Sequence, residues 1–322
     1  MAASLLLQIG ALLRSGRHGE AAQRLTGAAA AGDREAAAEL ARWRIAGTIV
    51  RRDLAAARAL LAQAGGAGDD ESARLHAYFL AAGVGGEADW RQARAELAAL
   101  AARDADAAAQ IALIEAMDLG AAVAAETLSE RPHVVAAPGF ATAAECDWLV
   151  RAAEPDLQPA TVVDPATGRL IPHPVRVSDG ATFGVFTEDL VVNAINRRIA
   201  ALSGTALDQS EPLQLLRYRP GGEYRAHMDA LPAEPNQRIA TALVYLSDDY
   251  EGGETQFLRT GLGFRGRKGD ALLFRNVTDD GRADPMALHA GLPVTRGVKA
   301  IASRWIRAAR FSYPPPRPLV DL

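Results

Sequence analysis

Cysteine is nearly absent from this chain, and its absence sets the first limit on what the protein can be. Cys146 is the single cysteine among 322 residues, so no disulfide can form within the chain. Small secreted domains usually depend on disulfides, whereas cytosolic proteins keep their thiols reduced. The N-terminus also lacks the basic segment and long apolar stretch of a secretory signal peptide. We therefore expect a cytoplasmic protein.

Long hydrophobic runs and a large excess of one charge are lacking as well. No stretch approaches the roughly 18–20 apolar residues of a membrane-spanning helix. Lys and Arg number 35 against 39 Asp and Glu, which leaves a net charge of −4. This balance gives no general affinity for nucleic acid or for acidic membranes. We expect neither nucleic acid nor a membrane among the partners.

Proline is missing from the first 131 residues of the chain, and Pro132 is the first to occur. Residues 1–123 are rich in alanine, with Leu, Arg and Glu between the alanines. Alanine and leucine are strong helix formers, and β-branched residues are scarce in this region. The composition predicts a helical N-terminal domain.

The same region repeats itself, because residues 35–70 align without a gap on residues 71–106, a period of 36. The matched pairs are Gly47 with Gly83, Asp53 with Asp89, Leu54 with Trp90, Ala57 with Ala93, Arg58 with Arg94 and Leu61 with Leu97. Such a period predicts stacked helix pairs, in which small residues allow close approach and each glycine ends a helix. The pattern resembles Sel1-like repeats, which are related to tetratricopeptide repeats. We expect an α-helical repeat solenoid over residues 1–123; a plain alanine-rich helical bundle is the alternative.

The amino-acid composition changes after Pro132, where β-rich segments alternate with Gly, Pro and Asp turns. Strands are predicted at 213–219, 239–246, 270–274 and 299–306, and helices at 142–154 and 188–203. The first helix begins with Thr142-Ala-Ala-Glu145, the spacing of a capping box. Short strands of this kind are typical of a sandwich or barrel. The fold expected is therefore α+β and multidomain, with a double-stranded β-helix, or jelly roll, and flanking helices over residues 132–313.

Three residues of this second region have the chemistry of a metal site. His227 and Asp229 are two apart, so both could share one face of a strand, and His289 follows 60 residues after the aspartate. Two histidines and one carboxylate can occupy one face of an iron(II) ion and leave other positions open. A His-x-Asp pair alone is weak evidence, since it often occurs by chance.

Lys299, ten residues beyond His289, adds a second kind of signal. In the predicted strand 299–306, Lys299, Ser303 and Trp305 share one face. A lysine facing a barrel interior is costly without a partner, and a dicarboxylate would supply one. The alternatives are a surface lysine on an edge strand and a Trp305 that serves only as core.

The ordered motifs of this region resemble the prolyl 4-hydroxylase-like branch of the iron(II)/2-oxoglutarate dioxygenases. They run Leu216-Arg-Tyr218, Pro220-Gly-Gly-Glu-Tyr224, His227-x-Asp229, Arg238-Ile-Ala-Thr241, Tyr245-Leu-Ser-Asp248, Gly252-Gly-Glu-Thr255, Lys268-Gly-Asp270, Leu288-His-Ala-Gly291, Gly297-x-Lys299 and Trp305-Ile306. The resemblance implies that His227, Asp229 and His289 are catalytic iron ligands, and that Lys299 and Tyr218 bind the distal carboxylate of 2-oxoglutarate. Thr241 and Trp305 would line the same pocket. Iron(II) would be the cofactor, with 2-oxoglutarate and O2 as co-substrates; ascorbate is left open.

The function implied is hydroxylation of an aliphatic C–H bond, on a prolyl or related side chain of a protein or peptide. A repeat domain fused to such an enzyme favours a polypeptide partner, since solenoids present long concave surfaces. Two other interpretations stay open. One is a hydroxylase of a free amino acid or other small molecule. The other is a non-catalytic sensor of iron, 2-oxoglutarate or oxygen that acts through its repeats.

Overall fold

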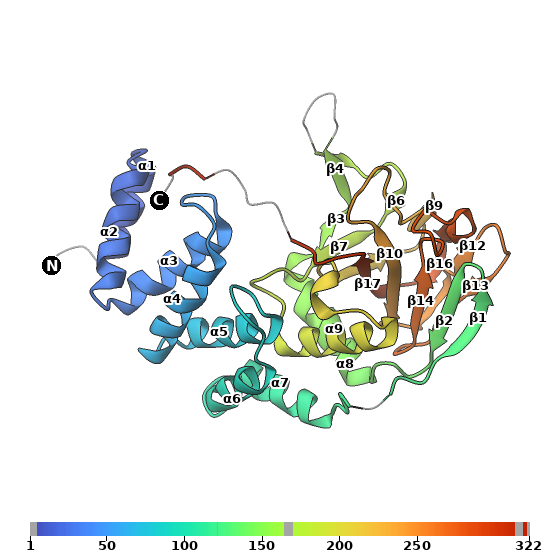
Figure 1. Cartoon of the computed structure of the whole chain (residues 1–322), viewed down its shortest axis with the longest axis horizontal. Helices are drawn as coiled ribbons and strands as arrows, with labels where there is room; N and C mark the ends of the chain where they lie inside the picture. The colour runs from blue at the N-terminus through green and yellow to red at the C-terminus, as the bar shows by residue number, and fades with distance from the viewer. Residues whose placement is uncertain (1–4, 121, 164–169, 313–317, 321–322) are drawn as a thin grey trace. The chain divides into compact units, whose positions relative to one another are not determined.

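The alanine-rich region forms a series of helices that each pack on the next (Figure 1). The computed structural model describes residues 5–120, 122–163, 170–312 and 318–320. The helices are α1 (Leu5–Arg14), α2 (His18–Ala30), α3 (Arg34–Ala46), α4 (Leu54–Gly66), α5 (Asp70–Ala82), α6 (Trp90–Leu100) and α7 (Ala105–Ala116). None of the helices in these ranges combines the length and the apolar character needed to cross a bilayer.

Residues that recur every 36 positions have equivalent places in α2, α4 and α6. Ala21, Ala57 and Ala93 are all completely buried. Their small side chains leave room for the neighbouring helices. The leucines four positions later, Leu25, Leu61 and Leu97, are also inaccessible to solvent. The internal repeat in the sequence is therefore a repeat of packing.

The ends of the helices follow the same repeat. Asp53 and Asp89 precede α4 and α6, and their carboxylates accept backbone N–H groups of Ala56 and Gln92 at 2.9 and 2.8 Å. Gly47 and Gly83 follow α3 and α5 with φ of 68° in both cases. That left-handed conformation costs glycine little, so the prediction that these glycines end helices is confirmed.

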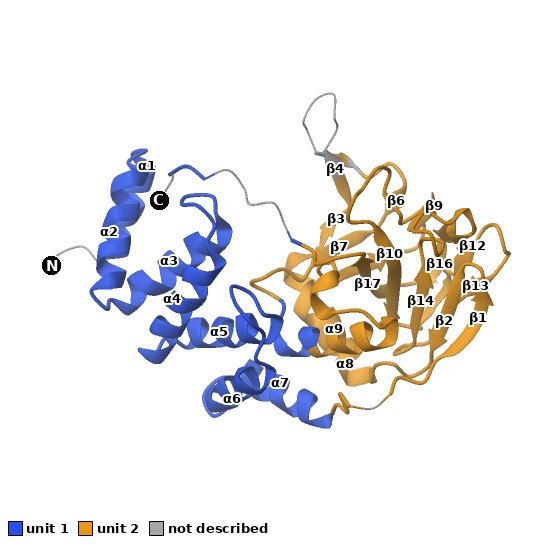
Figure 2. Ribbon diagram, in the orientation of Figure 1, with its two compact units in different colours: residues 1–116, 188–193, 312–322 blue, residues 117–187, 194–311 orange. Residues whose placement is uncertain are grey.

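The chain divides into two units (Figure 2). The first contains residues 1–116, 188–193 and 312–322, and the second contains residues 117–187 and 194–311. Near the C-terminus, the N–H groups of Leu319 and Val320 donate to the carbonyls of Thr48 and Ile49 at 2.9 and 2.8 Å. The helical unit thus includes a late segment of the chain. The expected boundaries at 123, 132 and 313 stay a prediction, and residue 313 lies outside the described residues.

The second unit is built on antiparallel sheets. Its strands are β1 (Glu126–Glu130), β2 (His133–Ala137), β3 (Gln158–Pro159), β4 (Thr161–Val163), β5 (Leu170–Pro172), β6 (Arg176–Val177), β7 (Asp179–Thr182), β8 (Gln214–Tyr218), β9 (Glu223–His227), β10 (Arg238–Tyr245), β11 (Tyr250–Gly252), β12 (Thr255–Phe257), β13 (Gly263–Phe264), β14 (Ala271–Arg275), β15 (His289–Gly291), β16 (Val294–Gly297) and β17 (Lys299–Arg307). One eight-stranded sheet has the order β1-β2-β14-β10-β17-β8-β7-β3, and a five-stranded sheet has the order β13-β12-β15-β9-β6. The predicted strands are β8, β10, β14 and β17.

Both sheets contribute to one hydrophobic core. Tyr245 and Phe274 come from the larger sheet and Phe257 from the smaller, and all three are completely buried. Phe257 and Phe274 meet edge to face, with ring centroids 5.1 Å apart. Because side chains alternate along each strand, every second side chain points into the space between the sheets. The candidate site also lies in that space.

Two helices accompany the sheets, α8 (Ala143–Ala153) and α9 (Leu190–Ser203). The capping box at the start of α8 is confirmed, because Thr142 and Glu145 exchange hydrogen bonds of 3.0 and 3.3 Å. Cys146 on this helix is buried, and burial raises the pKa of its thiol to about 12. The chain is thus a mixed α+β protein with a helical N-terminal region and a β-sheet domain.

Candidate metal centre and adjoining pocket

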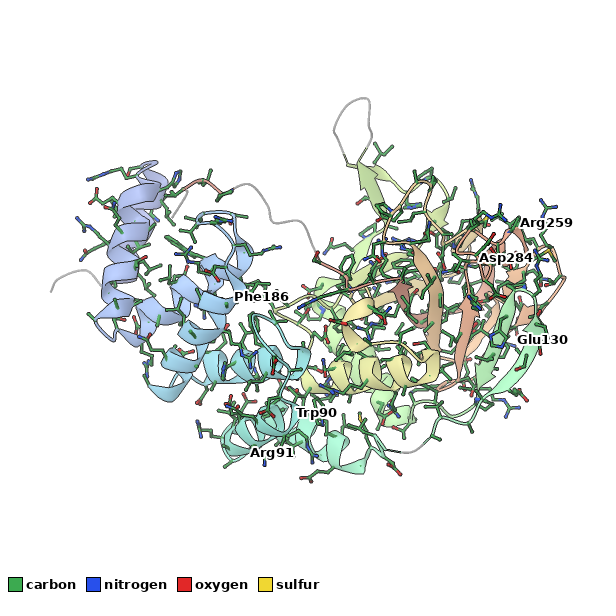
Figure 3. All side chains as sticks on the ribbon, in the orientation of Figure 1. Trp90, Arg91, Glu130, Phe186, Arg259 and Asp284 are labelled. Carbon is green, nitrogen blue, oxygen red and sulfur yellow. The ribbon has the colours of Figure 1, made fainter. Side chains whose placement is uncertain are left out.

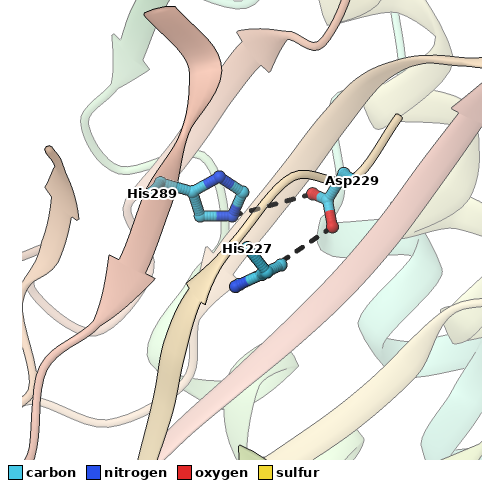
Figure 4. A group of neighbouring side chains, drawn as sticks. All are labelled: His227, Asp229 and His289. Atoms are coloured by element: carbon cyan, nitrogen blue, oxygen red, sulfur yellow. Dashed lines mark ion pairs between the residues drawn. The ribbon is translucent and has the colours of Figure 1, made fainter. Parts of the chain in front are cut away.

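Two neighbouring strands of the smaller sheet bring the predicted metal-binding residues together. In the antiparallel pair β9–β15, His227 lies directly opposite His289. The Nε2 atom of His227 is 3.6 Å from Asp229 Oδ1, and the Nε2 atom of His289 is 3.8 Å from Asp229 Oδ2 (Figure 4). Possible ligand atoms of all three residues lie within 4.8 Å of one another.

The placement of Asp229 corrects one detail of the sequence interpretation. His227 and Asp229 were expected to share the face of a single strand, but β9 ends at His227 and Asp229 lies in a bend. The loop that follows is closed by Gln237, whose side-chain amide hydrogen-bonds both the N–H and the carbonyl of Leu231 at 2.7 Å. A bend, and not the pleat of a strand, thus brings the carboxylate beside the imidazole.

Each histidine is oriented by a backbone carbonyl. His227 Nδ1 lies 2.8 Å from Arg225 O, and His289 Nδ1 lies 2.9 Å from Ala287 O. A carbonyl only accepts hydrogen bonds, so we assign the ring proton to Nδ1 in both residues. The Nε2 lone pairs then point to the space beside Asp229. In metal-binding histidines this is the nitrogen left free for the metal when Nδ1–H donates to a carbonyl.

The charge states also suit a divalent cation. Burial, with the neighbouring His289, lowers the pKa of His227 to about 4. Burial alone would raise the pKa of Asp229, but His289, His227 and the Thr241 hydroxyl outweigh it and hold that pKa below its ordinary value. At neutral pH the site therefore offers a neutral imidazole from His227 and a carboxylate from Asp229.

A buried hydrogen-bond chain holds the carboxylate. The Thr241 hydroxyl donates to Asp229 Oδ2 at 2.6 Å, and the Asn276 amide donates to Thr241 Oγ1 at 2.9 Å. Because the amide can only donate here, it leaves the hydroxyl proton for Asp229. Thr241 does line the pocket, as expected, and it also positions Asp229. Asn276 escaped the sequence interpretation, since no local pattern shows which residue approaches Thr241.

The three metal-binding candidates form one end of a pocket whose other end is Lys299. The pocket is lined by Leu216, Tyr218, Tyr224, His227, Asp229, Thr241, Leu243, Thr255, His289, Gly291, Lys299, Ile301, Ser303 and Trp305. Lys299, Ser303 and Trp305 face it together, so the predicted strand parity is confirmed. Lys299 is only 3% exposed, which rules out a surface lysine.

The surroundings of Lys299 are mostly apolar. Its Nζ donates to the carbonyl of Gly253 at 2.7 Å and lies 5.5 Å from the ring centroid of Tyr218. Burial lowers the pKa of the ammonium to about 8, against the opposing attraction of Glu254. Tyr218 is the residue opposite Lys299 in the β8–β17 register. The Gly252-Gly253 segment thus has a specific task, since the carbonyl of Gly253 holds the lysine.

Two aromatic residues border the metal end. Trp305 lies opposite Thr241 in the β10–β17 register. Its indole nitrogen is buried, with no hydrogen-bond partner among the described residues. Tyr224 stacks on His227 with ring centroids 3.5 Å apart and an interplanar angle of 14°, so it packs directly beside the metal motif.

The donor set and the buried lysine fit a metal ion with an anionic ligand. Two imidazole nitrogens and one carboxylate suit iron(II) and leave coordination positions open. A buried ammonium with one carbonyl partner suits a carboxylate at the opposite end of the pocket.

The sequence of this chain is similar to those of known proteins. Residues 213–307 match the 2OG-Fe(II) oxygenase superfamily. The chain is 35% identical over 201 residues to "Prolyl 4-hydroxylase 1" of Arabidopsis thaliana, covering 56% of this chain and 71% of the relative. It is 36% identical over 210 residues to "Probable prolyl 4-hydroxylase 3" of the same plant, covering 58% and 73%. Among solved structures, the viral collagen prolyl hydroxylase of Paramecium Bursaria Chlorella virus-1 aligns at 30% identity over 55% of this chain and 96% of that chain, with a TM-score of 0.44. The chain therefore belongs to the prolyl 4-hydroxylase-like family of 2OG-Fe(II) oxygenases, oxidoreductases that use iron(II), 2-oxoglutarate and dioxygen.

Proposed function

We propose that His227, Asp229 and His289 hold iron(II), and that Lys299 and Tyr218 receive the far carboxylate of 2-oxoglutarate. One observation carries this assignment: metal donors and a buried ammonium line a single pocket, in which Lys299 lies six residues before Trp305 on β17. Gly253 O is the one hydrogen-bond acceptor found for Lys299 Nζ in the described part of the chain. A dicarboxylate would complete both ends.

The protein residues supply orientation and exclusion of water. The backbone carbonyls of Arg225 and Ala287 aim both imidazoles, and Thr241 fixes the carboxylate. Lys299 would anchor the co-substrate at one end, so that its keto-acid end points at the metal. Bound iron(II) with 2-oxoglutarate and dioxygen supplies the oxidising power that hydroxylates an aliphatic C–H bond.

The side chains between the two ends keep water away. Leu216, Leu243 and Ile301 line the pocket and are buried. Apolar walls strengthen the attraction between Lys299 and a carboxylate, because fewer water dipoles screen it.

We propose a prolyl or related side chain of a protein or peptide as the substrate. The support is the likeness to relatives named prolyl 4-hydroxylases. The two sheets with their common core would form a double-stranded β-helix. The helical unit would be a repeat solenoid that recruits the polypeptide, and the equivalent burial of Ala21, Ala57 and Ala93 supports a repeating stack.

The test is incubation of the full chain with iron(II), 2-oxoglutarate and a set of proline-containing peptides. Mass spectrometry should find a product heavier by one oxygen atom, with matching succinate release. His289→Ala should give neither, whereas the exposed Arg282→Gln should behave as the wild type. Free proline in a parallel arm separates a peptide hydroxylase from a small-molecule one. A chain that binds 2-oxoglutarate but modifies none of these compounds would contradict the proposal.

A further inference from the structure

A second cavity, of about 270 Å³, lies at the edge of the β-sheet unit. Its polar lining comes from β6, β7, β8 and the residues beside them. The polar side chains are those of His173, Arg176, Ser178, Asp179, Arg217 and Arg219. Val177 and Pro220 add apolar surface. None of these residues was assigned a role in the metal centre, so the cavity requires a separate explanation.

The charges that line the cavity are unequal. Arg217 is neutralised, because it hydrogen-bonds Glu154 at 2.9 Å and Asp179 at 3.1 Å. Arg219 lies 3.5 Å from that same carboxylate of Asp179. Arg217 and Arg219 are thus balanced by Glu154 and Asp179, so the excess positive charge beside the cavity comes from Arg176.

Arg176 has no acidic partner at all within the described residues. Its guanidinium forms no ion pair there, and its Nε atom is buried without a hydrogen-bond partner. The hydroxyl of Ser178 is also buried without a hydrogen-bond partner. Buried polar groups are normally hydrogen-bonded, so a guanidinium Nε and a hydroxyl that both lack partners beside one cavity point to a ligand that supplies the acceptor.

A single side chain separates this cavity from the metal centre. Arg176 lies opposite Tyr224 in the β6–β9 register, with its guanidinium 5.6 Å from the Tyr224 ring centroid. Tyr224 in turn stacks on His227 at 3.5 Å. An extended peptide advances about 3.3 Å per residue. A residue roughly two to four positions from the reacting one could therefore reach the cavity.

We propose that this cavity is a substrate subsite that binds an acidic side chain, Asp or Glu, close to the residue that is hydroxylated. The inference rests on the proposed peptide hydroxylase function. Arg176 would form a charge-assisted hydrogen bond with the carboxylate, and Ser178 would donate a second one. Val177 and Pro220 would contact the aliphatic stem of the acidic residue.

The test uses two series of short peptides that each contain one proline. In the first series a single glutamate is moved through the four positions on each side of the proline, and in the second a glutamine takes its place. Binding is measured by calorimetry, without oxygen, on the full chain with iron(II) and 2-oxoglutarate. A charge-assisted contact exceeds a neutral one by about 1.4 kcal/mol, so glutamate should bind about tenfold more tightly than glutamine at one position.

Variants show whether Arg176 causes that preference. Arg176→Gln should bring the ratio between the glutamate and glutamine peptides close to one, and Arg176→Lys should restore part of it. Arg259→Gln removes the same charge from an exposed turn (Figure 3) and should keep the full ratio. Calorimetric binding of 2-oxoglutarate to each variant shows that its pocket is intact.

The possible outcomes distinguish a failure of the subsite proposal from a failure of the proposed function. Equal binding of the two series by the wild type, or a preference that survives in Arg176→Gln, overturns the subsite. If the glutamine peptides gain an oxygen atom and glutamate brings no advantage, the function stands and the subsite is rejected. If no peptide in either series gains an oxygen atom, the proposed function fails and the subsite with it.

Discussion

The two ends of the central pocket are held in different ways. At the metal end, every candidate ligand is oriented by a hydrogen bond from the protein: His227 by Arg225, His289 by Ala287 and Asp229 by Thr241. At the other end, Lys299 is a buried cation with one carbonyl acceptor and two aromatic rings, those of Tyr218 and Tyr245, as neighbours. The metal end is organised before anything binds, whereas the proposed ligand would complete the lysine end. Substitutions at the metal end should therefore abolish activity, whereas substitutions at the lysine end should weaken the binding of 2-oxoglutarate by degrees.

The largest effect is expected at the metal end, from Asp229→Ala. The change removes one of three protein ligands together with the negative charge of the site. Loss of an outer partner alone typically costs about 10–100-fold in metal affinity, so we expect iron(II) binding to fall by more than about 100-fold and succinate release to stop. Anaerobic calorimetry and thermal unfolding measure affinity and fold. Asp279→Ala, at a side chain 97% exposed, is the matched control. Near-normal turnover in Asp229→Ala would refute the ligand assignment.

A graded effect is expected at the other end, from Lys299→Ala. A charge-assisted contact is worth about 1.5–3 kcal/mol, so the apparent constant for 2-oxoglutarate should rise roughly tenfold to a few hundredfold. Iron(II) affinity should hardly change, because Lys299 does not contact the metal ligands. Tyr218→Phe, which removes a neutral hydroxyl, should raise the same constant by less than about tenfold. Succinate release against 2-oxoglutarate concentration provides both values, and an unchanged titration in Lys299→Ala would place the carboxylate elsewhere.

The lysine end should also respond to pH. Burial lowers the pKa of Lys299 to about 8, and only the protonated form attracts a carboxylate. Above that pH the apparent dissociation constant of 2-oxoglutarate should rise roughly tenfold per pH unit. Lys299 affects the stability of the fold in the opposite direction, because a rise in pH weakens the binding of 2-oxoglutarate but strengthens the fold. A lysine pKa lowered from about 10.4 destabilises the fold at low pH, and the destabilisation is relieved as pH rises above about 8. Binding by Lys299→Met should lose the pH dependence; a wild-type affinity that is flat between pH 7 and 9.5 would contradict this account.

The smallest effect is expected behind the metal end, from Asn276→Leu. Without the amide, the Thr241 hydroxyl is no longer constrained to donate to Asp229. Iron(II) affinity should fall by about two- to tenfold, the range of one neutral hydrogen bond, while the constant for 2-oxoglutarate stays the same. Thr241→Val should weaken iron(II) binding similarly, and the double variant should be no worse than Thr241→Val alone. Additive losses would show that Asn276 acts by another route.

Local patterns predicted the parts of this protein that depend on neighbours in the sequence. The capping box of Thr142 and Glu145, the helix-ending Gly47 and Gly83 and the common face of Lys299 and Trp305 all follow from short-range geometry. The order of the motifs identified the three candidate metal ligands, because each lies in a short stretch typical of the family.

Other features depend on pairings between distant strands, and no local rule contains them. Asn276 meets Thr241 only because β14 lies beside β10 in the larger sheet. The Gly253 carbonyl reaches Lys299 across 46 positions in sequence. Asp229 was expected within a strand because alternation is the simplest way to align two side chains, but hydrogen bonds of the Gln237 side chain favour a bend instead. The charge imbalance around Arg176 likewise appears only when three strands are assembled.

The return of Leu319 and Val320 to the loop at Thr48 and Ile49 has a consequence for rearranging this chain. Residues 1–116 and 312–322 both belong to the helical unit, so most of the oxygenase domain stands in the sequence between two parts of its neighbour. Trimming or extending the carboxyl terminus should therefore disturb the alanine-rich helices before it disturbs the iron site.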